Sequence, residues 1–131
     1  MKRILILGCG GTAAHNFIKC LRNANYRYFI VGTDLNQYHL AVADVDVRES
    51  LPDHPTHEFP THINELIKRH EIEFVYAAPD VMVQRLSLHR DAIKDRTFLP
   101  SHRAISICHD KFMTSKNLSN ADVPIAHFRH L

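Results

Sequence analysis

The sequence has 131 residues, of which 45% are hydrophobic and 23% charged, and its formal net charge is +2. This length fits one domain that can bury roughly two thirds of its unfolded surface, and the composition is typical of a soluble globular protein. Basic residues never form a dense run, which argues against nucleic-acid binding. The apolar runs fall far short of the ~20 residues of a membrane span or of a signal-peptide core. We therefore expect a cytoplasmic protein.

The predicted elements alternate between strand and helix. In chain order, the first half predicts a buried strand at 2–7, a glycine turn at 8–12, an amphipathic helix from 13 to about 23, a strand at 28–33, a helical turn at 40–43 and a weak strand at 45–48. The first helix is expected to turn one face toward the core, because apolar residues recur there at helical spacing. These residues are Ala13, Phe17, Cys20, Leu21 and Ala24.

The second half begins with three prolines and then resumes the alternation. It predicts a helix that starts with Thr61 as its cap and ends near His70, a strand at 74–77, a helix at 81–93, a short strand at 97–99, and a last helix capped by Ser101 that continues to about Ala121. Such alternation indicates an α/β fold. We expect a Rossmann-like three-layer α/β/α architecture with a mostly parallel sheet.

The turn after the first strand carries the strongest local signal. Three of the four glycines, Gly8, Gly10 and Gly11, lie within four positions, and Thr12 and Ala13 complete a G-x-G-x-x-A pattern between a strand and a helix. In this context backbone N–H groups and the helix dipole can hold an anion. The same pattern also fits a tight strand-to-helix turn that holds no ligand.

An acidic residue follows the second strand. Asp34 is placed where dinucleotide-binding folds have an acid that bonds a ribose hydroxyl. It can equally cap a loop, so the glycines and Asp34 indicate the fold more strongly than they indicate NAD.

The cysteines and histidines form no recognised site in the sequence. Cys9, Cys20 and Cys108 are odd in number and widely spaced, which does not suit a disulfide framework. Cys9 is expected to be a neutral loop residue, although a reactive thiol at a helix N-terminus is the alternative. The eleven histidines lack zinc-ligand spacing and are expected to be scattered on the surface, as illustrated by His54, His57, His62, His102 and His109. We predict no metal site.

Several short segments in order and spacing resemble the N-terminal part of ATP-grasp ligases, particularly proteins similar to the large subunit of carbamoyl-phosphate synthase. The segments that carry the resemblance are Ile4 to Gly10, Gly32-Thr33-Asp34, Ala43-Asp44, Ile63 to Ile67, Phe74 to Asp80, Asp110-Lys111, Thr114, Leu118 and Val123-Pro124. The resemblance covers nearly the whole chain.

The resemblance implies that residues 1–109 are a Rossmann-like pre-ATP-grasp domain and that 110–131 are a helix and the start of an ATP-grasp domain. Such a lobe is non-catalytic, usually does not bind NAD, and forms one wall of the substrate and nucleotide site. Lys111 would contact a nucleotide phosphate, for which a lysine ammonium is well suited. The glycine loop and the turn at Pro79 and Asp80 would face the substrate.

The resemblance also implies what lies beyond this chain. The remaining ATP-grasp lobes would follow downstream or on a separate chain, and would supply most of the ATP and Mg site, while small carboxylate and amine molecules would be the substrates. We expect this chain alone to be inactive and to bind no cofactor tightly, and a homodimer is possible. Two departures are that relatives often have glycine at Ala121 or Asp122 and a second proline at Ala126.

Two other hypotheses use the same glycine loop and Asp34. The first is a stand-alone Rossmann module that senses NAD or another nucleotide and regulates a partner. The second is the cofactor-binding half of a dehydrogenase. Neither explains the segment from Asp110 to Pro124, and this favours the ligase hypothesis.

Overall fold

The computed structural model describes residues 1–51, 53, 57–93 and 97–126. The described elements are β1 (Lys2–Leu7), α1 (Thr12–Arg22), β2 (Tyr28–Asp34), α2 (Gln37–Val42), β3 (Val47–Ser50), α3 (Phe59–Arg69), β4 (Phe74–Ala77), α4 (Asp80–Leu88), α5 (His102–His109) and α6 (Lys111–Asn120). They form two compact units, residues 1–99 and residues 100–131.

The first unit is built on a parallel sheet with strand order β3-β2-β1-β4. β1 pairs with β2 from Lys2 opposite Tyr28 to Leu7 opposite Thr33, and it pairs with β4 on its other side. All the described strands are parallel. The chain therefore moves outward from β1 to β3 and then returns to the far side of β1, which creates a topological switch point between β1 and β4.

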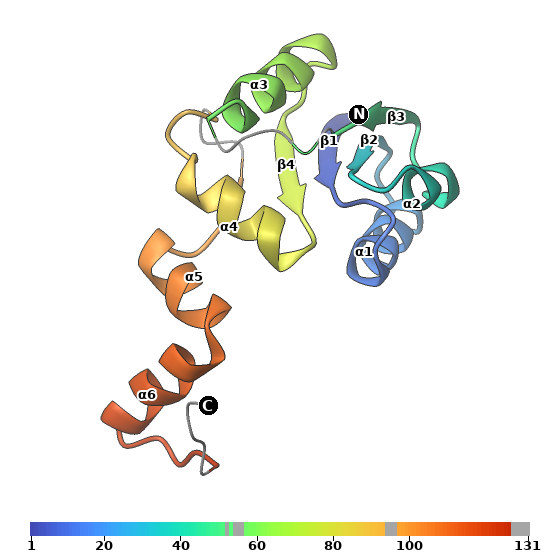
Figure 1. Ribbon diagram of the computed structural model, residues 1–131. Coiled ribbons are helices and arrows are strands. Elements are labelled where there is room, and N and C mark those ends of the chain that lie inside the picture. The colour runs from blue at the N-terminus through green and yellow to red at the C-terminus, as the bar shows by residue number, and fades with distance from the viewer. Residues whose placement is uncertain (52, 54–56, 94–96, 127–131) are drawn as a thin grey trace. The chain divides into compact units, whose positions relative to one another are not determined.

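Alternate side chains of a strand point to opposite faces of the sheet. Apolar strand residues therefore lie on both faces, and helices cover both. α1 and α2 lie on one face, where Ala14, Ile18 and Leu40 pack against Ile4, Ile6 and Ile30. α3 and α4 lie on the other face (Figure 1), where the buried side chains include Phe59, Ile63, Leu66 and Leu86 with Leu5, Leu7 and Val75. The predicted three-layer α/β/α fold is confirmed.

The structure corrects the predicted face of α1 and the start of α3. Phe17 and Leu21 of α1 pack against the core as expected, but the fully buried residues are Ala14 and Ile18. Ala13, Cys20 and Ala24, which were expected on this face, are exposed. α3 starts two residues before Thr61, at Phe59, because Pro60 fits the first turn of a helix, where its missing N–H has no intrahelical partner.

Two predictions for the chain after α4 were wrong. Residues 97–99 do not form a strand: Phe98 is 89% exposed, and Leu99 packs beside the core without sheet pairing. The single helix expected from Ser101 to Ala121 is two helices. Asp110 has extended backbone angles and interrupts the helix, because its carboxylate accepts a hydrogen bond from Met113 N and starts α6 anew.

The second unit is a pair of helices joined through Asp110. Ser101 caps α5, as predicted, by accepting a hydrogen bond from Ala104 N. The Thr114 hydroxyl lies within hydrogen-bond distance of Ile107 O and Asp110 O and links α6 to the end of α5. The unit includes α5 as well as α6 because the two helices contact each other. Residues 127–131 lie outside the described part of the chain.

Candidate functional site at the carboxyl edge of the sheet

The strand order brings three segments singled out from the sequence to one edge of the sheet. β1 lies between β2 and β4, and parallel strands end at the same edge. The glycine loop after β1, Asp34 at the end of β2 and the Pro79-Asp80 turn after β4 are therefore neighbours. In open α/β sheets ligands bind at this edge, near the switch point.

Gly8 is the residue at which the loops after β1 and β4 meet. Its φ of +71° lies in the left-handed region that glycine adopts without strain. A Cβ at this position would lie 2.3 Å from Pro79 Cγ, so the proline ring fills the space above the glycine. Gly8 is therefore required both by its backbone conformation and by the close approach of Pro79.

Gly10 is the residue at which the same loop meets α2. A Cβ here would lie 2.4 Å from both His39 Cβ and His39 O. The Gly10 N–H donates to Asp34 Oδ2 at 3.0 Å, and the Asn36 N–H donates to Asp34 Oδ1 at 2.9 Å. Asp34 thus holds the glycine loop against the start of α2, and its side chain is only 10% exposed.

Gly11 and Thr12 lie where the loop becomes α1. Gly11 is the N-cap residue, and a Cβ there would meet no atom closer than Gly8 O at 3.6 Å. Thr12 is exposed at the first position of the helix. These two residues are the part of the loop that the rest of the chain covers least.

Cys9 is buried in this loop and is not a reactive thiol. Burial, followed by the nearby charge of Asp34, raises the pKa of Cys9 to about 11, so the thiol stays protonated at neutral pH. Its Sγ packs where Gly32 lacks a side chain, since a Cβ on Gly32 would lie 2.8 Å from it. The expectation of a neutral loop residue agrees with this environment.

Pro79 and Asp80 begin α4 beside the glycine loop. The Pro79 carbonyl accepts hydrogen bonds from Met82 N and Val83 N, and Ala78 N donates to Leu7 O, which ties the turn to the end of β1. Asp80 is exposed in the first turn of α4, where a carboxylate is favoured by the helix dipole. The turn therefore presents one free carboxylate at the carboxyl edge.

Lys111 belongs to the second unit, residues 100–131. It is exposed at the first position of α6, directly after the Asp110 cap. A cation at this end of a helix is opposed by the helix dipole. The hydrogen bonds of Asp110 and Thr114 fix the turn from which Lys111 projects.

Asp122 lies at one of the two positions where the resemblance to ATP-grasp ligases leads one to expect glycine. It follows the end of α6 with a φ of +56°, in the left-handed region, and Asp122 N and Val123 N donate to Ser119 O and Leu118 O. This is the closing turn that usually selects glycine. Of the two positions at which the resemblance leads one to expect glycine, 121 and 122, the second has a glycine-like conformation with an aspartate.

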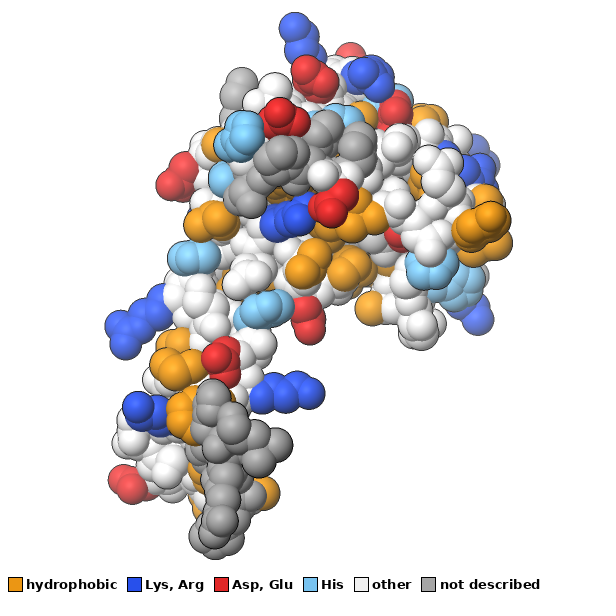
Figure 2. Space-filling view, viewed as in Figure 1, with side chains coloured by type: hydrophobic (Ala, Val, Ile, Leu, Met, Phe, Trp, Pro, Cys, Tyr) orange, Lys and Arg blue, Asp and Glu red, His pale blue; other side chains and the backbone are white. Residues whose placement is uncertain are grey.

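Of the histidines that the structure describes, most are exposed, but His62, His70 and His89 are half-buried. Figure 2 shows their side chains at separate places on the visible face. Within residues 1–51, 53, 57–93 and 97–126, no three His, Cys, Asp or Glu residues gather in a way that could hold a metal ion. His54 lies outside these ranges. In the same part of the chain, no helix has the length and apolar character needed to cross a membrane.

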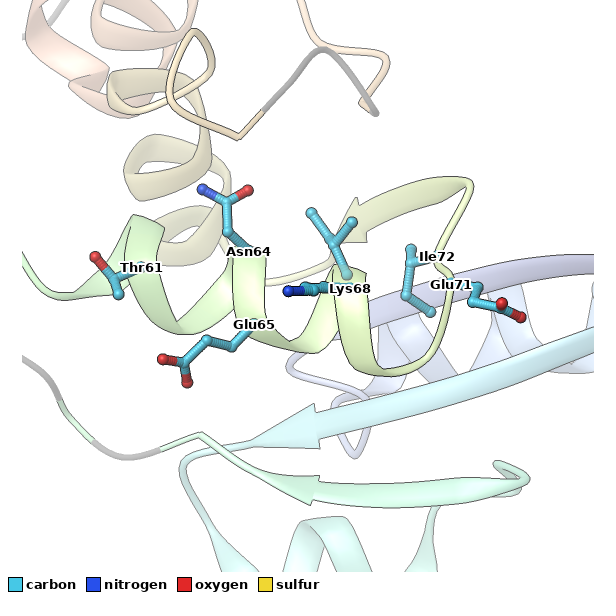
Figure 3. A pocket seen from close by; sticks show the side chains of 7 residues that line it. Thr61, Asn64, Glu65, Lys68, Glu71 and Ile72 are labelled. Atoms are coloured by element: carbon cyan, nitrogen blue, oxygen red, sulfur yellow. The ribbon is translucent and has the colours of Figure 1, made fainter.

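A surface hollow that the sequence analysis did not anticipate runs along α3. It has a volume of about 660 Å³ and is lined by Thr61, Asn64, Glu65, Ile67, Lys68, Glu71 and Ile72. Figure 3 shows these side chains projecting from α3 and from the turn before β4. Because Glu71 and Ile72 precede β4, the hollow reaches toward the amino edge of the sheet, away from the edge where such folds bind ligands. Its polar residues are those of an ordinary solvated helix face, so no sequence signal distinguished it.

Solved structures show where this fold occurs. N5-carboxyaminoimidazole ribonucleotide synthetase from Thermotoga maritima matches with a TM-score of 0.65 and 18% identity, over 97% of this chain and 32% of that protein. The biotin carboxylase domain of a single-chain bacterial carboxylase matches with a TM-score of 0.53 and 14% identity, over 95% of this chain and 30% of that protein.

A third match is dTDP-glucose 4,6-dehydratase from Bacillus anthracis in complex with NAD. Its TM-score is 0.52 and its identity 14%, over 76% of this chain and 36% of that protein. These identities establish a shared fold and nothing finer, and the chain spans about a third of the length of each protein. No protein-family model and no curated protein sequence matches the chain.

Proposed function

We propose that this chain is the N-terminal, non-catalytic lobe of an ATP-dependent carboxylate–amine ligase of the ATP-grasp type, similar to the large subunit of carbamoyl-phosphate synthase. The lobe would form one wall of the substrate and nucleotide site. The synthetase and the carboxylase that share its fold are ligases of the ATP-grasp type, and the sequence resemblance leads to the same class.

One observation carries the proposal: how far along the chain each structural match extends. Residues 1–99 are 99 of 131 residues, or 76% of the chain. The NAD-bound dehydratase covers just this share, whereas the two ligases cover 97% and 95%. Coverage above 76% requires residues from the second unit. The matches to the two ligases therefore extend beyond the sheet-based unit into residues 100–131.

Within this proposal Lys111 and the turn at Pro79 and Asp80 have different parts. Lys111 contacts a phosphate of ATP from the start of α6, where its exposed ammonium is free to reach a ligand. Pro79 and Asp80 face the substrate from the carboxyl edge of the sheet. ATP and Mg are held mainly by ATP-grasp lobes located downstream or on a separate chain, and a small carboxylate and an amine are the molecules joined.

The alternative is a nucleotide- or NAD-sensing module, and the fold of the NAD-bound dehydratase favours it. In that case the residues in contact with the cofactor would be Gly8, Gly10, Gly11, Thr12 and Asp34. Asp34, however, already accepts hydrogen bonds from Gly10 N and Asn36 N. NADH at millimolar concentration would raise the melting temperature of a sensing module, because ligand binding stabilises the folded state. The ligase lobe should show no such shift.

The first test is the source gene beyond the codon for Leu131. Continuation by ATP-grasp lobes, or a neighbouring gene that encodes them, would support the proposal. The assembled protein should then form ADP from ATP in the presence of Mg and a carboxylate substrate. If no such lobes are encoded and ATP turnover is absent, the proposal fails.

Lys111→Ala tests the assigned contact in that assembled protein. Loss of a charge-assisted hydrogen bond to phosphate should raise the KM for ATP by about 10- to 100-fold. Lys116→Ala is the matched control, because Lys116 is also an exposed lysine of α6. Equal effects of the two substitutions would contradict a specific role for Lys111.

A further inference from the structure

The glycine loop after β1 has the position of an anion-binding loop, but its donors already have partners in the chain. Gly8 N and Cys9 N both donate to Thr33 O, at 2.8 and 2.9 Å. Gly10 N donates to the Asp34 carboxylate, and Gly11 N donates to Gly8 O at 3.3 Å. The N–H groups of Gly8, Cys9, Gly10 and Gly11 therefore all have acceptors within the chain.

We infer that the Asp34 carboxylate is itself the anion held by this loop, so that the chain fills its own anion site and the loop excludes nucleotide and dinucleotide phosphates. One oxygen of Asp34 accepts from Gly10 N and the other from Asn36 N, while His39 Nδ1 lies 4.0 Å from the carboxylate. A carboxylate bonded to backbone N–H groups in this way reproduces the contacts of a bound anion.

The space around the loop leads to the same inference. In dinucleotide-binding folds the second glycine is needed so that the pyrophosphate can approach the backbone. Here the space beside that residue, Gly10, holds His39, and the space beside Gly8 holds Pro79. The glycines therefore allow close packing of protein groups, and the 10% exposure of Asp34 leaves little surface for a ribose.

Charge at this edge also opposes a phosphate. The segments 8–13, 34–38 and 78–82 contain Asp34 and Asp80 and no lysine or arginine. A dinucleotide would bring two further negative charges beside these carboxylates, which would repel them. The inference holds whether or not the chain is a ligase lobe, because it depends only on the loop and on its own contacts.

Removal of the internal anion, followed by its replacement from solution, tests this inference. Asp34→Ala should lower the melting temperature by about 10 °C, because two backbone N–H groups lose a charged partner. Sodium formate, a carboxylate small enough for the vacated space, should restore part of this loss relative to sodium chloride at equal ionic strength. Asp80→Ala, which removes an exposed carboxylate, is the matched control. Wild type and Asp80→Ala should each have the same melting temperature in sodium formate as in sodium chloride.

The same measurement with nucleotides and phosphate completes the test. NADH, ATP and inorganic phosphate should leave the melting temperature of the wild type unchanged. If Asp34→Ala does not fold, Asp34→Asn keeps an oxygen acceptor, and its melting temperature should lie below that of the wild type. A wild-type shift with NADH or phosphate would overturn the inference. So would an Asp34→Ala variant as stable as the wild type, or one that responds alike to formate and chloride.

Discussion

Residues 1–99 bury side chains on both faces of a parallel sheet, whereas residues 100–131 are shaped mainly by hydrogen bonds between near neighbours. In the first unit the buried side chains come from strands and helices distant in sequence. In the second, Ile105 is the one buried hydrophobic residue of the described part, and α6 contains none. Met113, Leu118 and Val123 are each about 40% exposed.

The difference between the two units shows which of them carries the stability of the chain. Burial of apolar surface is the main favourable term in folding, so the sheet-based unit should unfold cooperatively. The helical unit depends on the caps at Ser101 and Asp110 and on the Thr114 hydroxyl, each of which contributes about 1 kcal/mol. We therefore expect α5 and α6 to open at lower free energy than the sheet.

The largest expected effect comes from the core of the first unit. Phe59→Ala removes a side chain that is 1% exposed and should lower the free energy of unfolding by about 3–5 kcal/mol. Leu118→Ala in α6, where the side chain is 40% exposed, should cost about 1 kcal/mol or less. Urea denaturation of the two variants measures both values. Similar losses would show that the two units are equally well packed.

An intermediate effect is expected at the junction of α5 and α6. Asp110→Ala removes the carboxylate that accepts from Met113 N and should destabilise α6 by about 1 kcal/mol. Amide hydrogen exchange should show faster exchange over α5 and α6 and unchanged protection in β1 and β4. Asp110→Asn, which retains a capping oxygen, is the control. Faster exchange in the sheet would show that the units unfold together.

The smallest effect is expected at the end of α6, and it is a gain. Asp122 has a left-handed backbone, which glycine adopts without steric cost. Asp122→Gly should therefore stabilise the second unit by about 0.5–1 kcal/mol, visible as slower amide exchange in α6. Asp110→Gly is not an equivalent change, because Asp110 has a negative φ and acts as a cap. Faster exchange in Asp122→Gly would mean that the aspartate side chain of the wild type stabilises α6 by more than its left-handed backbone costs.

Parts of the site could be predicted from the sequence because their signals are local. A strand, a glycine-rich turn and a helix in succession predict the loop, and the alternation of strands and helices predicts that β1, β2 and β4 end at one edge. The pair Asp110-Lys111 indicates a helix start, and Asp110 does cap α6. The continuous helix expected from Ser101 to Ala121 was wrong, because extended and helical conformations compete at an N-cap residue. On α1, Phe17 and Leu21 pack against the core as expected, whereas Ala14 is buried in place of Ala13, which has the same hydrophobicity.

The sequence by itself determined the α/β class, the glycine turn after β1, the acid after β2 and the capped helices of the second unit, since each depends on residues close together in the chain. Only the tertiary structure decided what fills the glycine turn. His39 and Pro79 occupy the space beside Gly10 and Gly8, and Asp34 lies 24 positions from its partner Gly10. Such contacts depend on how strands and helices pack, and nothing in the residues next to the turn specifies them.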